Sequence, residues 1–370
     1  MLRYATITAL FLAAVLAPRA GGEPKENAMQ HIPVSDPRIQ VCGLPWYAED
    51  APEMVRLPVR LKETFRRPLW AQALHGSGAR LRFRTDSLSV DLKAAVRRQT
   101  MHHMAPTGSA GFDIYVDNFY VGTGLHDAQG RFLKTKREEP WTIGRERKMR
   151  DITVYLPLYS PARVDEIILD GAAKLEAPRP FARSKPVVFY GTSITQGGCA
   201  ANPGASYPAI VCRRLNVDFV NLGFSGNGMG DVEVARAMTE IDCSCIVLDY
   251  WANPSPDQLE RTPPVFVDTL REKFPDVPIL IPQPYFEPKD EIDETWRTTN
   301  ESKRRIIRAF VKVRREAGDA HIETIDGFEL LSKEYAYGLV DGRHCNTLGF
   351  HLFATGLEPH LRDALGLEKE

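Results

Sequence analysis

The stretch that decides the fold is residues 187–200, VVFYGTSITQGGCA, in which a short apolar run leads directly into a glycine-rich turn. Four apolar side chains in succession, Val187 to Tyr190, are typical of a strand that is buried on both faces, as in a parallel sheet. The turn then places Ser193 at the carboxyl end of that strand. Open parallel sheets bind their ligands at this end, so the serine stands where chemistry is expected.

Beyond this strand, short apolar runs alternate with longer amphipathic segments. The short runs predict further strands, and the longer segments predict helices. Strands that alternate with helices form a parallel sheet covered on both faces. The expected strands are 187–190, 219–222, 246–248, 279–281 and 322–325, and the expected helices are 207–215, 232–241, 266–274, 303–317 and 348–365.

The N-terminal half has a different period. Between residues 55 and 175, apolar and polar side chains alternate, as in 81–84 and 112–117. Period-two alternation predicts antiparallel sheets with one buried face, and we expect a β-sandwich or jelly roll. Three prolines and mixed charge in 176–186 indicate a linker. The predicted domains are therefore a β-sandwich over 30–178 and an α/β domain over 184–368.

Residues 1–22 differ from the rest of the chain. Arg3 is followed by an apolar run over 5–17 and then by small residues, a pattern typical of a secretory signal peptide. The run is too short for a membrane anchor, so we expect a secreted or periplasmic protein without membrane insertion after cleavage; the alternative is a buried helix. With 47 basic and 48 acidic residues, the chain lacks the basic excess that recruits nucleic acid.

An exported protein can form disulfides, and this chain has cysteines to pair. We expect Cys243 and Cys245 to be buried free thiols, whereas a bridge between Cys199 and Cys345 is possible. The six cysteines are Cys42, Cys199, Cys212, Cys243, Cys245 and Cys345.

The loops that follow the predicted strands carry the groups that acyl transfer needs. Ser193 is the candidate nucleophile, and a serine hydroxyl needs a base to take its proton. His344 is the candidate base, and Asp341 stands three residues earlier, where it can orient the imidazole. The oxyanion of a tetrahedral intermediate needs fixed donors. The candidates are the N–H groups of Ser193 and Gly226 and the side-chain amide of Asn253.

This order of blocks resembles the SGNH, or GDSL-like, hydrolases. The matching stretches are YGTSITQGGCA at 190–200, NLGFSGNG at 221–228 and DGRH at 341–344. GFDIY at 111–115 is similar to the GxDLY signature of a two-domain branch whose N-terminal domain is a β-domain. The resemblance implies a flavodoxin-like three-layer α/β/α domain that hydrolyses esters or thioesters without a metal or organic cofactor. It gives Ser193, Gly226, Asn253, Asp341 and His344 the roles described above.

The chain departs from the family pattern at three positions. Thr192 stands where an Asp usually precedes the nucleophile, Trp251 stands where a Gly usually occurs two residues before the Asn, and Cys345 follows the base in place of Pro. We interpret Thr192 and Trp251 as substrate-binding residues, with Trp251 forming a wall of the acyl pocket.

Other patterns have simpler interpretations. The glycines of 223–230 do not have the G-x-G-x-x-G spacing of a dinucleotide loop. Adjacent His102 and His103 indicate a solvated turn more than a metal site, because neighbouring strand residues face opposite ways. Asp113 is expected on a core strand and could reach the mouth of the site. Arg304 is expected on a solvated helix face.

Together these features predict an exported serine esterase that removes small acyl groups, in particular acetyl, from carbohydrate. Its expected partner is an acylated small molecule or glycan, which a neighbouring β-sandwich can grip. One alternative is a fatty-acyl esterase, thioesterase or lysophospholipase. A second alternative, suggested by Trp251, is an inactive carbohydrate-binding protein on a hydrolase fold.

Overall fold

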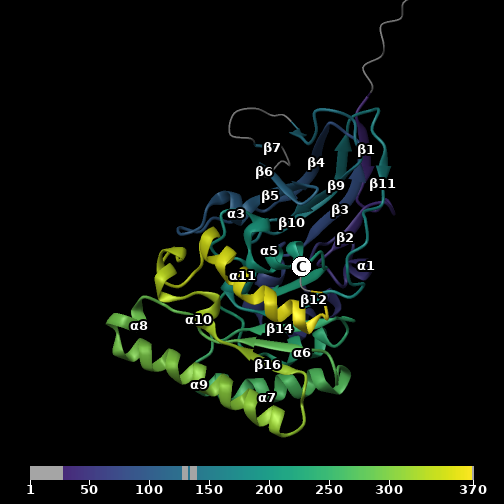
Figure 1. Ribbon diagram of the computed structural model, residues 1–370. Coiled ribbons are helices and arrows are strands. Elements are labelled where there is room, and N and C mark those ends of the chain that lie inside the picture. The colour runs from purple at the N-terminus through teal and green to yellow at the C-terminus, as the bar shows by residue number, and fades with distance from the viewer. Residues whose placement is uncertain (1–27, 127–131, 134–139, 369–370) are drawn as a thin grey trace, which may run out of the picture.

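The computed structural model describes residues 28–126, 132–133 and 140–368. The predicted signal peptide lies outside these residues. Antiparallel strands occupy one end of the molecule in Figure 1, and a parallel sheet with long helices occupies the other. Within the described ranges, no helix combines the length and the apolar character needed to cross a membrane.

The N-terminal part is an antiparallel β-sandwich, as predicted. Among the described residues, one sheet has the order β1-β10-β4-β8, and the other has the order β11-β3-β9-β5-β6-β7 with β2 paired to β3. The strands are β1 (Gln30–Pro33), β2 (Gln40–Cys42), β3 (Arg80–Thr85), β4 (Ser89–Val96), β5 (Gly111–Val116), β6 (Phe119–His126), β7 (Phe132–Leu133), β8 (Trp141–Thr142), β9 (Arg150–Tyr155), β10 (Ala162–Leu169) and β11 (Leu175–Glu176).

The sandwich is held together by the apolar side chains that the alternation predicts. Leu81 and Phe83 of β3 share one buried core with Val90 and Leu92 of β4 on the facing sheet. Burying such side chains stabilises the fold by about 1.5–3 kcal/mol each, which explains why the pattern fixes the register.

The beginning of the region expected to form strands is helical instead. Residues 59–64 form the 3-10 helix η1 (Val59–Thr64), and residues 67–73 form α2 (Arg67–Ala73). A proline at the start of α2 fixes a helical backbone angle there, and the segment has no period-two alternation. Two further short helices are α1 (Tyr47–Asp50) and α3 (Pro106–Ala110).

The C-terminal part has the predicted parallel sheet, with the strand order β13-β12-β14-β15-β16. This is the flavodoxin-like order. Helices α5 and α11 pack together on one side of the sheet, and α7 and α9 pack together on the other (Figure 1). The strands are β12 (Val187–Gly191), β13 (Phe219–Gly223), β14 (Cys245–Asp249), β15 (Ile279–Pro282) and β16 (Ile322–Ile325). The helices are α4 (Ser193–Gln196), η2 (Pro203–Ala205), α5 (Tyr207–Arg214), α6 (Val232–Met238), α7 (Pro256–Lys273), α8 (Lys289–Ile292), α9 (Glu294–Glu316), α10 (Gly327–Leu330), η3 (Lys333–Gly338) and α11 (Thr347–Ala364).

Two helices begin about two to three turns earlier than predicted. Helix α7 starts at Pro256 because Ser255 and Gln258 form a reciprocal capping box. Helix α9 starts at Glu294 because the Asp293 carboxylate accepts a hydrogen bond from the Trp296 N–H.

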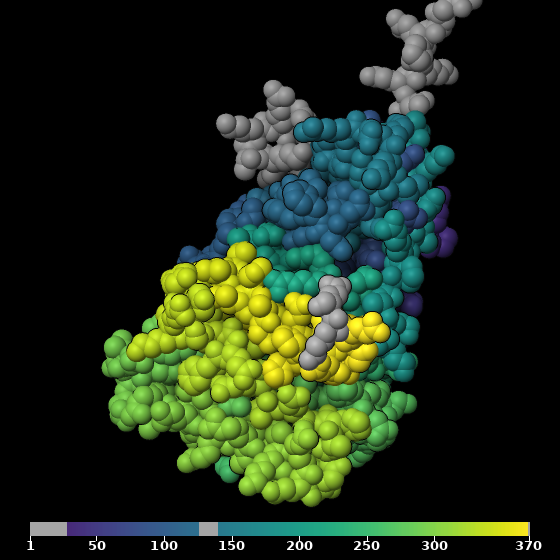
Figure 2. All heavy atoms as spheres, in the orientation of Figure 1, coloured from purple at the N-terminus to yellow at the C-terminus, as the bar shows by residue number. Residues whose placement is uncertain are grey.

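The two parts are joined by buried polar contacts at the turn that carries Ser193. The Tyr159 hydroxyl donates to the Ser193 carbonyl at 3.2 Å, and the Ser77 hydroxyl donates to the Gln196 carbonyl at 2.6 Å. In the space-filling view of Figure 2, the yellow C-terminal segment packs directly between the β-rich part and the lower part of the molecule. The β-sandwich is therefore part of the wall that supports the α/β domain's serine.

Asp113, in the GFDIY stretch, lies on the buried strand β5, as expected; the alternative, that it reaches the mouth of the site, is wrong. Its side chain is fully buried and accepts hydrogen bonds from the Asn202 amide and the Gly204 N–H, both at 2.6 Å, and from the Thr123 hydroxyl at 2.6 Å. Asp113 thus ties β5 of the sandwich to the loop that follows α4.

We expect Asp113 to make the protein less stable as pH rises from about 4 to 6. Burial raises the pKa of Asp113 from 3.8 to about 6, although hydrogen bonds from Thr123, Gly204 and Asn202 act in the opposite direction. In this window the unfolded carboxyl ionises while the folded one stays protonated, so the unfolded state binds fewer protons. The free energy of unfolding should fall by on the order of 2–3 kcal/mol. Urea unfolding at both ends of the window should show a smaller fall in Asp113→Asn; an equal fall would contradict the assignment.

Candidate active site

The structure brings Ser193, His344 and Asp341 into one hydrogen-bonded row. The Ser193 Oγ lies 2.9 Å from the His344 Nε2, and the His344 Nδ1 lies 2.8 Å from the Asp341 Oδ2. The remaining oxygen, Asp341 Oδ1, accepts the His344 backbone N–H at 2.8 Å. Because the carboxylate faces Nδ1, the ring proton belongs there, and Nε2 presents its lone pair to the serine.

Ser193 is presented by a tight turn at the end of β12. Thr192 caps the short helix α4, with its hydroxyl oxygen 3.3 Å from the Ile194 N–H. Thr192 is fully buried, so the substrate-binding prediction for it is corrected to a capping role. The helix ends after one turn at Gly197, whose φ of +106° suits glycine. Ser193 therefore projects from a rigid, short element.

Asp341 is held in its ionised form. Burial tends to raise its pKa, but hydrogen bonds from the His344 backbone and ring, together with the charge on His344, lower the pKa of Asp341 to about 2. The carboxylate is therefore available at neutral pH to orient the imidazole and to stabilise its protonated form.

The three candidate oxyanion donors lie on loops at the same edge of the sheet. Ser193 is the first residue of α4, so its N–H has no acceptor within the helix. The Gly226 N–H donates to no group among the described residues, and its φ of +67° is a conformation that favours glycine. The Asn253 Oδ1 accepts the Gly228 N–H at 3.2 Å, which leaves its Nδ2 as the free donor.

Two of these loops fit together because of a glycine. A Cβ atom on Gly228 would lie 2.3 Å from the Gly191 carbonyl oxygen, which is a severe clash. The Phe224 N–H also donates to the same carbonyl at 2.9 Å. The loop after β13 can thus approach the nucleophile turn closely only when residue 228 lacks a side chain.

Two family models match this chain. The GDSL-like lipase/acylhydrolase family matches residues 184–362, and the N-terminus of SGNH-hydrolase-type esterases matches residues 29–174. The chain therefore carries a GDSL-like lipase/acylhydrolase domain that follows the N-terminal domain of SGNH-hydrolase-type esterases. A search among curated proteins finds no match for this hydrolase.

Solved structures share the fold of the hydrolase over 92% of its chain. A protein from Bacteroides ovatus ATCC 8483 classed as a GDSL-like lipase has a TM-score of 0.82 and 25% identity, with 99% of that chain covered. The salicylyl-acyltransferase SsfX3 of a tetracycline biosynthetic pathway has a TM-score of 0.75 and 22% identity over 98% of its chain. A family two carbohydrate esterase from Clostridium thermocellum, in complex with cellohexaose, has a TM-score of 0.61 and 14% identity over 99% of its chain.

Trp251 of the hydrolase is a packing residue. Its side chain is 1% exposed and stands edge-on to the Tyr285 ring at 5.2 Å. A side chain in this position offers no surface to a substrate, so the predicted acyl-pocket wall is corrected to a core contact. Asn253, two residues later, still reaches the loop after β13.

A buried polar network beneath the hydrolase's site was not predicted. Arg343, between the two triad residues of the DGRH stretch, pairs with fully buried Glu287 at 3.0 Å and donates to the Ala252 carbonyl at 3.3 Å. Lys303 of α9 donates to the Trp251 carbonyl at 3.0 Å. These contacts link the triad loop to the Asn253 loop.

The prediction that Arg304 lies on a solvated face of α9 is wrong. Its guanidinium is buried and donates to the Pro284 carbonyl at 2.9 Å and to Asp290 at 3.1 Å. A run of basic residues gave no sign that some of them point inward, because helix charge alone does not distinguish the two faces.

The cysteines of the hydrolase are free thiols, all of them buried. This agrees with the prediction for Cys243 and Cys245. Cys199 and Cys345 are joined by a backbone hydrogen bond of 2.9 Å and not by a disulfide. The expectation of a solvated turn at His102 and His103 is only half right, since the His103 ring lies 5.4 Å from the His344 ring.

Asn253 provides a direct test of the oxyanion donors. We expect Asn253→Ala to lower kcat by about 10²–10³-fold with little change in KM, because the lost donor acts on charge that develops in the transition state. Steady-state kinetics on an activated acetyl ester would measure this change. Asn227→Ala, on the neighbouring loop, is the control and should retain activity within a few-fold; equal losses in both variants would remove Asn253 from the site.

Proposed function

We propose that this hydrolase is an exported serine esterase that removes small acyl groups from carbohydrate, with acetyl as the preferred group. The observation that carries the proposal is the continuous row from the Ser193 Oγ through His344 to Asp341, with distances of 2.9 and 2.8 Å. Donors on separate loops face the same edge of the sheet. This set of groups is the one that acyl transfer through a serine requires.

The reaction follows from the positions of these groups. Ser193 Oγ attacks the ester carbonyl while His344 Nε2 takes the hydroxyl proton, and Asp341 stabilises the resulting imidazolium. The oxyanion forms beside the N–H groups of Ser193 and Gly226 and the Asn253 amide. The alcohol leaves with the proton from His344, and an acyl-serine remains.

Water then completes the turnover. His344 takes a proton from the water molecule as its oxygen attacks the acyl-serine, and the same donors hold the second oxyanion. Collapse of this intermediate releases the carboxylic acid and returns the proton to the Ser193 oxygen. One ester and one water thus give one acid and one alcohol.

A small acyl group is supported by where the cavities lie. Ser193 itself is 7% exposed. Three cavities of about 470, 530 and 340 Å³ are lined by other residues, including Arg213, Ala95 and Arg271 respectively. A long acyl chain bound in any of them would lie away from the triad, which favours acetyl over the fatty-acyl, thioesterase and lysophospholipase alternatives.

A carbohydrate partner is supported by an aromatic side chain beside the triad loop. Tyr337 is 65% exposed, and its carbonyl accepts the Asn346 amide at 2.8 Å, just after His344. An exposed aromatic ring beside a site is a platform on which a flat ligand face can rest. The carbohydrate esterase that shares this fold was solved with cellohexaose.

The proposal that the enzyme is exported is supported by the signal-peptide pattern of residues 1–22. An exported enzyme would act in a periplasm or outside the cell. The inactive binding-protein alternative is disfavoured, because Trp251, which suggested it, is buried in the core and leaves the Asn253 donor in place.

The substrate is tested by comparing acyl lengths and alcohols. We expect kcat/KM for p-nitrophenyl acetate to exceed that for p-nitrophenyl octanoate by at least about tenfold, because the three cavities described above lie away from Ser193 and offer the longer chain no room beside it. On an acetylated cello-oligosaccharide, Tyr337→Ala should raise KM several-fold and leave p-nitrophenyl acetate unaffected. A preference for octanoate would overturn the acetyl assignment. An unchanged KM in Tyr337→Ala would overturn the proposed role of Tyr337 in binding carbohydrate.

A further inference from the structure

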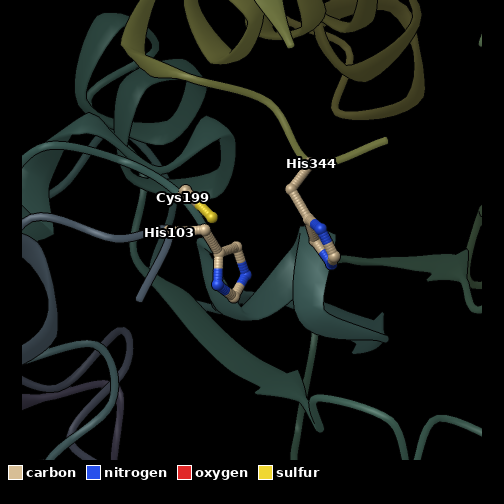
Figure 3. A group of neighbouring side chains, drawn as sticks. All are labelled: His103, Cys199 and His344. Atoms are coloured by element: carbon tan, nitrogen blue, oxygen red, sulfur yellow. The ribbon is translucent and has the colours of Figure 1, made fainter. Parts of the chain in front are cut away.

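A second histidine and a cysteine stand beside the triad base. His103, from the segment between β4 and α3, has its ring centroid 5.4 Å from that of His344. Cys199, from the loop after α4, is the third member. One ring nitrogen of each histidine and the Cys199 Sγ all lie within 4.8 Å of one another (Figure 3). Neither His103 nor Cys199 has a part in the proposed reaction.

The His103 ring is also unsatisfied. Its Nδ1 is buried and has no hydrogen-bond partner among the described residues. A buried ring nitrogen without a partner is unfavourable, and it becomes favourable when a ligand that accepts its lone pair is bound. The side chains approach from separate segments, with His103 on the β-sandwich and the other two on the α/β domain (Figure 3).

We propose that His103, Cys199 and His344 form a binding site for Zn²⁺ that reversibly switches the enzyme off. Two imidazoles and a thiolate are ligands that Zn²⁺ prefers, with water in the fourth position. Metal-binding histidines commonly donate their other ring N–H to a carboxylate, and Asp341 already accepts from the His344 Nδ1 at 2.8 Å. The carboxylate that orients the base for catalysis therefore also orients it for the metal.

Inhibition follows because the metal and the serine compete for one lone pair. The Ser193 hydroxyl lies 2.9 Å from His344 Nε2, the nitrogen that faces away from Asp341. When that nitrogen coordinates Zn²⁺, it cannot take the serine proton. This inference rests on the proposed function for the inhibition, whereas the binding of Zn²⁺ stands independently.

Zn²⁺ binding releases the thiol proton of Cys199, so the affinity for Zn²⁺ should rise with pH. Burial raises the pKa of the Cys199 thiol to about 12, with a smaller contribution from the Asp341 charge. The free thiol is therefore protonated at neutral pH; on binding, a Zn–S bond forms and the thiol proton passes to solvent.

The ligand atoms must also move closer together when the metal binds. Zinc–ligand bonds of about 2.0–2.3 Å imply distances of roughly 3.5 Å between ligand atoms, so the three side chains must approach one another by about 1 Å.

The test is Zn²⁺ titration of the reduced protein, read by calorimetry and by hydrolysis of p-nitrophenyl acetate. We expect one site, inhibition that a chelator reverses, and no inhibition by Mg²⁺, which prefers oxygen ligands. In His103→Asn and Cys199→Ser, the Zn²⁺ concentration for half inhibition and the Kd should rise by roughly 10- to 100-fold while basal turnover persists.

His102→Asn is the matched control, because His102 is exposed and neighbours His103 without belonging to the group. It should bind and respond to Zn²⁺ as the unaltered protein does. Equal Zn²⁺ sensitivity in all four proteins, or the absence of a calorimetric site, would overturn the proposal. His103→Asn remains informative where Cys199→Ser fails to fold. If no ester is hydrolysed, the calorimetric comparison still decides the site, so failure of the esterase proposal is distinguishable.

Discussion

Replacing Ser193 by Ala should lower kcat for p-nitrophenyl acetate by about 10⁴–10⁶-fold, and His344→Ala should cost about as much. The reason is that the two residues act as one unit: the hydroxyl attacks only as Nε2, 2.9 Å away, takes its proton. The double variant should therefore be no slower than either single variant. Single-turnover and steady-state kinetics on all three proteins would measure the coupling.

The control for these three variants is a measurement of their stability. Ser193→Ala removes a single oxygen atom, and His344 is 20% exposed, so each variant should unfold at nearly the same denaturant concentration as the unaltered protein. Losses that multiply in the double variant would show that Ser193 and His344 act separately, and the row of hydrogen bonds would then not be the catalytic unit.

Arg56→Ala should have the largest effect on stability, lowering the free energy of unfolding by about 4 kcal/mol or more. The Arg56 guanidinium is fully buried and donates to backbone carbonyls on both sides of the domain boundary. Its removal leaves these acceptors unpaired and a cavity in their midst. The acceptors are the carbonyls of Gln72, His75, Asn221 and Gly223.

Arg60→Ala is the matched control for Arg56→Ala. The Arg60 side chain is 47% exposed and pairs with Glu49 and Glu240, so its loss should cost less than about 1 kcal/mol. Guanidinium chloride unfolding measures both changes. Asn221 and Gly223 lead into the Gly226 loop, so Arg56→Ala should also lower kcat. If Arg56→Ala proved as stable as Arg60→Ala, the stability of the two domains would not depend on the Arg56 contacts.

Much of the fold was predictable because local patterns and tertiary structure agree. The alternation around Leu81 and the apolar run at Val187 each report which faces are buried, and both sheets follow from them. The candidate residues Ser193, Gly226 and Asn253 follow separate strands, and parallel strands bring such ends to one edge. Sequence order was therefore enough to expect that they meet.

The remaining features depend on contacts between distant segments. His103 reaches His344 across the domain boundary, and nothing in the His102–His103 pair indicates which ring turns inward. Trp251 packs against Tyr285, which comes later in the chain, and Arg304 donates to Pro284, which comes earlier. The early start of α7 is different, because the residues of its capping box, Ser255 and Gln258, have the spacing that marks a helix start in the sequence.

The measurement that tests the central claim most directly is the site of acyl transfer to the enzyme. The protein would be treated with a fluorophosphonate, an ester analogue that traps serine nucleophiles, then digested and mapped by mass spectrometry. A single adduct on Ser193, reduced in rate by His344→Ala and absent in Ser193→Ala, is the predicted result. An adduct on another residue, or no adduct in a folded protein, would contradict the assignment of Ser193 as the nucleophile.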